Sequence, residues 1–156
     1  MKNGSRDGYG VLKLDKIVYR GTWKNDRLVG KAEKEIGKNK YIGYFDEKCQ
    51  LSGEGEYAGD DGSIYNGNFR NNLFDGQGVY ISPDGDKYVG QFSKGEFSGQ
   101  GVYFWKNGQK YVGYFRHSQL HGAGTMYYKD GGQDIGYWEY NKLKTIKKSV
   151  RIAERK

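Results

Sequence analysis

Only a few residues in this sequence are of the types that perform catalysis or bind metals, and their spacing argues against both roles. The two histidines, His117 and His121, are four residues apart, which on a helix would place both rings on one side as a metal-binding pair. The surrounding pattern indicates a hairpin loop instead. Similar segments 23 and 46 residues earlier carry Ser98 and Asp75 in the position of His121. We therefore expect no metal site at these residues.

The remaining candidates for chemistry are equally isolated. Cys49 lies beside Lys48, but no histidine that could activate it as a nucleophile is near in the sequence. The Asp-Gly-Asp run at 84–86 lacks the roughly twelve-residue spacing and terminal Glu of a calcium loop. The Gly-x-Gly motifs precede strand-like residues, whereas nucleotide-binding loops precede a helix. We expect a protein that is not an enzyme and uses no cofactor.

The composition indicates one small domain with an unusual core. The chain has 156 residues, of which 35% are hydrophobic and 16% aromatic, with 15 Tyr, 7 Phe and 3 Trp. Aromatic rings must therefore supply most of the core, and the 26 glycines require a positional explanation. A single cysteine, no apolar leader and no long apolar segment lead us to expect a cytoplasmic protein.

The charge is unevenly distributed along the chain. The net charge is +7, but residues 1–40 carry 11 basic and 5 acidic side chains, and residues 139–156 carry 7 and 2. Residues 41–138, between these basic ends, carry 8 basic and 12 acidic side chains. Binding of nucleic acid is unlikely on this evidence, because it requires basic residues interleaved with the aromatic ones.

A repeat of about 23 residues organises most of the sequence. A tyrosine opens the pattern Tyr-x-Gly-x-aromatic five times, at intervals of 22, 24, 23 and 23 residues; these are Tyr19, Tyr41, Tyr65, Tyr88 and Tyr111. A Gly-x-Gly pair and an Asp-Gly or Asn-Gly pair recur with the same period. Such a period indicates a chain built from stacked copies of one supersecondary unit.

Both patterned stretches alternate with period two, which predicts strands, and the Asp-Gly pairs predict tight hairpin turns. One hairpin cannot bury its own apolar face, so the copies must pair edge to edge. The sequence therefore predicts an all-β fold, an elongated single-layer antiparallel sheet of some twelve strands. A glycine opposite each ring leaves room for that ring to lie on the backbone.

The repeat unit resembles that of the MORN (membrane occupation and recognition nexus) family from Tyr19 to about Trp138. The first repeat departs most from the family pattern, because Ala32 replaces a glycine and residues 31–35 are too charged for a regular strand. The resemblance implies a non-catalytic interaction or scaffold module in a cytoskeletal, ciliary or membrane-junction assembly. From the residues themselves we expect a long interface, rich in aromatic rings, that binds an extended segment or a helix of a partner protein.

The predicted organisation is a sheet over residues 1–140 followed by a tail over residues 141–156. The sheet consists of a half repeat at 8–18, repeats starting at 19, 41, 65, 88 and 111, and a half repeat at 134–140. In the tail, Leu143, Ile146, Val150 and Ala153 are spaced by 3, 4 and 3 residues, which predicts a basic amphipathic helix. Such a tail also resembles that of the retinophilin family, whose role is to bind a myosin tail.

The face opposite the repeated rings becomes apolar toward the C-terminus, so we expect it to be covered by a partner or by the tail. The predicted partner-binding residues are Val89, Phe104, Val112, Tyr114, Tyr127, Tyr137, Leu143, Ile146 and Val150. The alternative is peripheral binding to anionic phospholipid through Lys144, Lys147, Lys148, Arg151 and Arg155. The tail could cap the sheet, dock into a partner or lie on lipid, and the sheet ends could form a homodimer.

Overall fold

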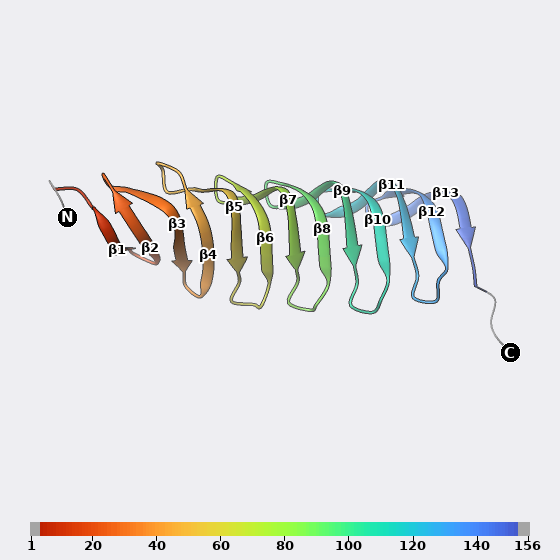
Figure 1. The fold of residues 1–156 in the computed structure, drawn as a ribbon. Helices are drawn as coiled ribbons and strands as arrows, with labels where there is room; N and C mark the ends of the chain where they lie inside the picture. Colours follow the sequence, from red (N-terminus) through yellow and green to blue (C-terminus); the bar gives the residue numbers. More distant parts are fainter. Residues whose placement is uncertain (1–3, 153–156) are drawn as a thin grey trace.

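A computed structural model describes residues 4–152 as one antiparallel sheet of thirteen strands. The strands are β1 (Gly8–Leu14), β2 (Ile17–Lys24), β3 (Arg27–Ile36), β4 (Asn39–Phe45), β5 (Leu51–Ala58), β6 (Ile64–Arg70), β7 (Leu73–Ile81), β8 (Lys87–Ser93), β9 (Glu96–Phe104), β10 (Lys110–Arg116), β11 (Gln119–Tyr127), β12 (Gln133–Glu139) and β13 (Lys142–Val150). Each strand pairs with its neighbours in chain order, so β1 and β13 lie at opposite ends of a long ribbon (Figure 1). The all-β, single-layer prediction is confirmed.

The hairpins alternate between two kinds of turn. The Asp-Gly and Asn-Gly pairs form wider turns in which the glycine has a positive φ, for example 94° at Gly85. The opposite turns contain two residues, except for the five-residue loop 46–50 between β4 and β5. Both turn residues have positive φ at Asn71–Asn72, His117–Ser118 and Tyr140–Asn141. Two such residues match the right-handed twist of the flanking strands. The hairpin loop predicted to hold both histidines contains only His117 and Ser118, because β11 begins at Gln119 and includes His121.

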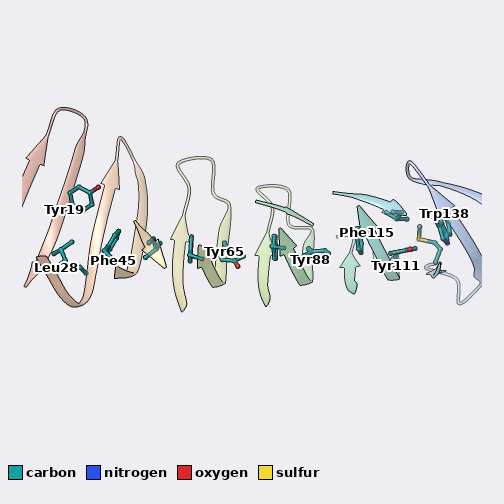
Figure 2. Packing of buried hydrophobic residues seen from close by; sticks show 14 of the residues in the cluster. Tyr19, Leu28, Phe45, Tyr65, Tyr88, Tyr111, Phe115 and Trp138 are labelled. Carbon is teal, nitrogen blue, oxygen red and sulfur yellow. The ribbon is translucent and has the colours of Figure 1, made fainter. Parts of the chain in front are cut away.

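The core lies on one face of the sheet, which we call the aromatic face. It carries the buried rings Tyr19, Trp23, Phe45, Tyr65, Phe69, Tyr88, Phe92, Tyr111, Phe115 and Trp138. Figure 2 shows labelled members of this set spread along the ribbon from Tyr19 to Trp138. Among the described residues no second layer covers these rings, so they must bury one another.

Ring contacts connect each repeat to the next. Tyr65 stacks on Phe74 with centroids 3.8 Å apart and meets the edge of Phe92 in the following repeat at 5.0 Å. Tyr88 repeats this arrangement with Phe97 at 4.0 Å and Phe115 at 5.0 Å. Stacked and edge-on geometries are the favourable ones for aromatic pairs. The rings thus form a continuous column that holds neighbouring hairpins together.

Glycine provides the space that each tyrosine ring occupies. A Cβ atom at Gly78 would lie 2.7 Å from Cζ of Tyr65, which is closer than atoms can approach. The ring is held in this place because its hydroxyl donates a hydrogen bond to the Asn68 carbonyl oxygen at 2.6 Å. The predicted packing of ring on glycine is therefore present in the structure.

The charged first repeat forms a regular strand, contrary to the prediction. Ala32 lies opposite Gly43 and is buried, so its methyl group replaces the missing glycine without disrupting β3. Lys34 is also buried, with its ammonium group 5.8 Å from the Tyr19 ring centroid and 5.9 Å from that of Tyr41. Cation–π contacts of this kind offset part of the cost of burying a lysine.

The predicted C-terminal helix is wrong, because the tail continues the sheet as β13. Asn141, in the turn before it, donates its backbone N–H to the Leu120 carbonyl at 3.1 Å, and its side-chain oxygen accepts the Leu120 N–H at 2.8 Å. These bonds direct the chain back along β12. Ala153, which belonged to the predicted helix, lies outside the described residues.

Two β-bulges explain why the tail appeared helical in the sequence. The pairing of β12 with β13 skips Lys144 and Lys147, so each of them is an extra residue in the ladder. Leu143 and Ile146 therefore lie on the same face although they are three residues apart. A spacing of three is normally typical of a helix, and here a bulge produces it in a strand.

A polar cluster closes the aromatic face at its C-terminal end. Asp134 stands where the next repeat would have its tyrosine, and it is buried. Its carboxylate accepts hydrogen bonds from the Tyr128 hydroxyl at 2.6 Å, the Ser149 hydroxyl at 2.7 Å and the Arg151 guanidinium at 2.8 Å. These bonds, led by that of Tyr128, lower the pKa of Asp134, so the buried carboxylate stays charged.

Candidate functional site

The face opposite the rings, which we call the groove face, carries one continuous row of directly opposed residues. The row runs from β1 to β13 through Val11, Arg20, Glu33, Ile42, Glu56, Asn66, Val79, Val89, Val102, Val112, Thr125, Ile135 and Lys148. Because side chains alternate between faces in a strand, the row points away from the aromatic core. No other element among residues 4–152 covers it.

Three adjoining hollows make this face a groove. The first, of about 290 Å³, is lined by Tyr9, Arg20 and Ile42 among others, and it shares Lys31 with the second. The second has a volume of about 570 Å³ and shares Gln77 with the third, which has about 440 Å³. The shared residues show that the hollows are consecutive, so the groove extends from β1 to β10.

The chemistry of the groove changes along its length. At the N-terminal end Arg20 bonds to Glu33 at 3.1 Å and to Glu35 at 2.6 Å, which leaves the charges there largely paired. In the second hollow Glu54 and Glu56 make no ion pair within the described part of the chain. The N-terminal half of the groove is therefore polar.

The C-terminal half of the groove is apolar along its centre. Val79, Val89, Val102 and Val112 lie side by side on β7 to β10. Three of them are half-buried, and Val112 is 38% exposed. Four adjacent valines facing solvent form the kind of apolar patch that marks an interaction surface.

Most of the predicted partner-binding residues lie on the groove face. Register and alternation place there Val89, Phe104, Val112, Tyr114, Tyr127, Tyr137 and Val150. Tyr137 is 61% exposed and Tyr114 is 44% exposed, so both rings are accessible. The structure thus brings these seven residues onto one surface.

Leu143 and Ile146 do not belong to that surface. Leu143 lies opposite Trp138 and packs against the aromatic core, and Ile146 lies opposite Gly136 on the same face. Both were assigned to the partner-binding set as part of a helical tail, and their role in binding stays a prediction. Ile146 is 61% exposed but points to the opposite side of the sheet from the valine row.

The predicted lipid-binding residues fall into two groups. Lys144, Lys147 and Lys148 are exposed on β13, at the end of the ribbon. Arg151 is bonded to the buried Asp134 and lies over the Tyr128 ring at 5.7 Å, so its charge is already engaged. Arg155 lies outside the described residues.

Sequence reasoning missed a row of glutamines beside the valines. The backbone N–H of Gln100 donates to Oε1 of Gln91 at 3.1 Å, and the Gln100 side chain donates to the Tyr114 hydroxyl at 3.0 Å. Gln77 completes the row and lines two of the hollows. Gln77 and Gln100 are 23 residues apart and each is the middle residue of a Gly-x-Gly motif, so the repeat period was a visible signal for these two.

The ionisable residues considered for chemistry are dispersed. His117 occupies a two-residue turn, where its Nδ1 lies 3.5 Å from a Glu96 oxygen, and His121 lies within β11 with its ring 5.7 Å from that of Tyr140. Cys49 lies between β4 and β5 and packs against the core. Within residues 4–152 no group of three or more His, Cys, Asp or Glu side chains is placed to hold a metal ion.

The buried tyrosines are structural. Burial raises the pKa of Tyr65, Tyr88 and Tyr111 to about 12, so all three keep their protons at neutral pH. Each hydroxyl donates to a backbone carbonyl three residues further along: those of Asn68, Gln91 and Tyr114. They therefore hold the sheet together.

Comparison with known proteins agrees with the repeat architecture. No match to a curated protein was found. Among residues 4–152 no helix has the length and apolar character needed to cross a bilayer.

The MORN repeat family profile matches residues 1–15, 19–34, 65–87, 88–110 and 111–133, which is more than half of the chain. Such repeats are generally non-enzymatic modules that bind proteins or membranes. The finer resemblance to the retinophilin family stays a prediction. With the hairpin stack and the profile in agreement, the chain belongs to the MORN repeat family.

Proposed function

We propose that this protein is a non-catalytic docking module that holds a segment of a partner protein along the groove face. The observation that carries the proposal is the uncovered row of four valines, Val79 to Val112, of which Val89, Val102 and Val112 line the third hollow of the groove. A segment that covers this row would remove apolar surface from water, at about 25 cal/mol for each Å² buried.

The geometry favours a linear segment over a globular partner. The four valines follow one another across β7 to β10, so at ~4.8 Å per strand the row is roughly 14 Å long. That length corresponds to about four residues of an extended chain or about ten of a helix. The neighbouring Gln77, Gln91 and Gln100 offer amide groups to the backbone or polar side chains of such a segment.

The test begins with peptides selected from a displayed library by binding to the intact chain. Their affinity is then measured by calorimetry for Val102→Asp and Val112→Asp, with Ile146→Asp as the matched control on the opposite face. We expect each groove variant to lose at least about tenfold in affinity, because the new carboxylate would be buried without a partner. Circular dichroism verifies that all variants are folded.

Two results would contradict the proposal. If the peptides bind the groove variants as tightly as they bind the original chain, they do not use the valine row. Peptides whose affinity falls only for Ile146→Asp bind the aromatic face instead.

A second candidate is peripheral binding to anionic phospholipid, which the exposed lysines at the end of β13 favour. Lys144, Lys147 and Lys148 project from one short strand, and basic residues near a membrane contribute about 1 kcal/mol each. The double variant Lys144→Gln, Lys147→Gln should then co-sediment with phosphatidylserine vesicles less than the original chain does. The control pair Lys24→Gln and Lys38→Gln, which removes the same charge from exposed sites in the N-terminal half, should retain binding. Equal losses in both pairs would indicate a non-specific charge effect.

We also propose, from the family alone, that the module works in a cytoskeletal, ciliary or membrane-junction assembly. Imaging of the fluorescently tagged chain together with markers of these structures tests the location. A diffuse distribution in every cell type examined would contradict it.

A further inference from the structure

The two ends of the sheet differ in how well they are protected against pairing with another strand. An edge strand presents unpaired N–H and C=O groups, and natural proteins block such edges with lysines and β-bulges. β13 has both devices, since Lys144 and Lys147 form its two bulges and Lys142 and Lys148 add further charge. A strand that approaches β13 meets an irregular, basic edge.

β1 has almost none of this protection. Its seven residues pair with β2 without a register shift, and the one positive φ among them is that of Gly8, at 89°. It carries one lysine, Lys13, among apolar side chains that remain accessible: Tyr9 is 76% exposed, Val11 51% and Leu14 53%. A largely apolar edge with a single charge favours the addition of a further strand.

We propose that two copies of this chain pair through β1, antiparallel and centred on Val11. In this register the two strands are aligned over residues 8–14, and Val11 lies opposite the partner subunit's Val11. On the aromatic face the glycines of one strand lie opposite the leucines of the other. Gly8 lies opposite the partner's Leu14, and Gly10 lies opposite the partner's Leu12. On the groove face Tyr9 lies opposite the partner's Lys13, a pairing that permits a cation–π contact.

The space for this packing is present in the structure. A Cβ atom at Gly8 would meet nothing within 4 Å, and one at Gly10 would meet only the Trp23 ring at 3.9 Å. The leucines of a second copy can therefore lie over these glycines. Large side chains over cross-strand glycines are the arrangement that the sheet already uses at its centre.

The pairing has a consequence for the groove. Because opposed residues of an antiparallel pair point to the same side, both groove faces lie on one side of a continuous sheet of twice thirteen strands. Tyr9 lines the first hollow, so the two grooves meet at the β1 junction. Their polar ends then lie together at the centre, and the valine rows lie outward. The pairing itself does not depend on the proposed docking function.

The test measures the mass of the intact chain in solution by sedimentation equilibrium over a wide concentration range. We expect a reversible dimer of twice 17.8 kDa, with no larger species. Val11→Lys and Val11→Glu should each be monomeric, because two like charges would face each other at the centre of the junction. An equimolar mixture of the two variants should restore the dimer, since opposite charges then meet.

The control is Ile146→Lys, which adds the same charge to an exposed residue of β13 and should leave the dimer unchanged. Circular dichroism of all variants separates loss of pairing from loss of folding. A monomeric wild-type chain at every concentration would overturn the proposal. So would a dimer that survives Val11→Lys, a mixture that stays monomeric, or a ladder of larger species that indicates head-to-tail growth.

Discussion

At the scale of single residues, stability depends on fitting a ring against a backbone that lacks a side chain. Tyr65 and Tyr88 each have a defined place, since each stacks on one ring, meets the edge of another and donates a hydrogen bond to a backbone carbonyl. The partners of Tyr65 come from three successive strands, so the ring cannot move aside without disturbing several contacts. Substitutions that fill the space should therefore be as damaging as those that remove the ring.

Gly78→Ala is expected to lower the free energy of unfolding by about 2 kcal/mol or more, within the range for overpacked cores. The added Cβ would overlap Tyr65, whose stacking on Phe74 at 3.8 Å prevents it from shifting. Urea unfolding followed by circular dichroism measures the change. The control is Gln77→Ala on the exposed groove face of the same strand, which should change stability by less than about 0.5 kcal/mol. Equal values for both variants would contradict the packing argument.

Alkaline pH is expected to destabilise the protein. Burial raises the pKa of Tyr65, Tyr88 and Tyr111 to about 12, whereas the unfolded chain ionises near its ordinary value of about 10. Below pH ~10 these three tyrosines are protonated in both the folded and the unfolded chain, so their full contribution to stability is present. Between about pH 10 and 12 these three tyrosines lose their protons in the unfolded chain but keep them in the folded one. The free energy of unfolding therefore falls as pH rises.

Urea unfolding at a series of pH values measures this loss, and Tyr88→Phe should reduce its steepness. The same variant loses the hydrogen bond to the Gln91 carbonyl at 2.7 Å, which costs about 1 kcal/mol at neutral pH. A pH profile identical to that of the original chain would show that Tyr88 ionises freely in the folded state.

At the scale of elements, the two-residue turns connect each hairpin to the preceding one. Asn72 donates its backbone N–H to the Leu51 carbonyl at 3.1 Å and accepts the Leu51 N–H on its side-chain oxygen at 2.8 Å. Asn141 makes the same pair of bonds with Leu120. A turn residue therefore fixes the register between repeats as well as reversing the chain.

Asn72→Ala should destabilise the protein more than Asn72→Gly. Both variants lose the side-chain bond to Leu51, at about 1 kcal/mol. Only alanine also opposes the φ of 70° at this position, which glycine adopts freely. Thermal unfolding of the two variants measures the difference. Equal melting temperatures would show that the backbone conformation at Asn72 contributes nothing.

The elements also show why the tail was misjudged and which signal was available. A leucine or phenylalanine recurs every 23 residues at Leu28, Leu51, Phe74, Phe97, Leu120 and Leu143. Each lies at or next to the start of its strand and opposite the last ring of the preceding strand. Leu143 continues this series, so the period indicated a further strand, whereas the local spacing of Leu143 and Ile146 indicated a helix. The long-range period was correct, because bulges alter spacing within a strand but leave the repeat length unchanged.

At the scale of the whole molecule, the ribbon is a one-dimensional array in which each strand pairs only with its neighbours. In such arrays stability is approximately a sum of local units and the interfaces between them. The central repeats have neighbours on both sides and contain the fully buried Tyr65, Tyr88 and Tyr111. The end strands β1 and β13 have one neighbour each.

Amide hydrogen exchange should therefore be slowest in β6 to β10 and fastest in β1 and β13 at low protein concentration. An end strand opens by breaking one ladder of hydrogen bonds, whereas a central strand must break two. Exchange measured by mass spectrometry on peptide fragments tests the gradient. Uniform protection from β1 to β13 would show that the whole sheet unfolds as one cooperative unit.

The sequence by itself determined the repeat, the strands, the single-layer sheet and the pairing of rings with glycines. These features follow from residue type and period alone, because every copy solves the same local packing problem. Three others are visible only in the tertiary structure: the two bulges of the tail, the continuity of the groove and the contrast between the edges. Each depends on register across strands, since Lys144 and Lys147 become bulges, and Val79 to Val112 become one row, only when particular residues lie opposite one another.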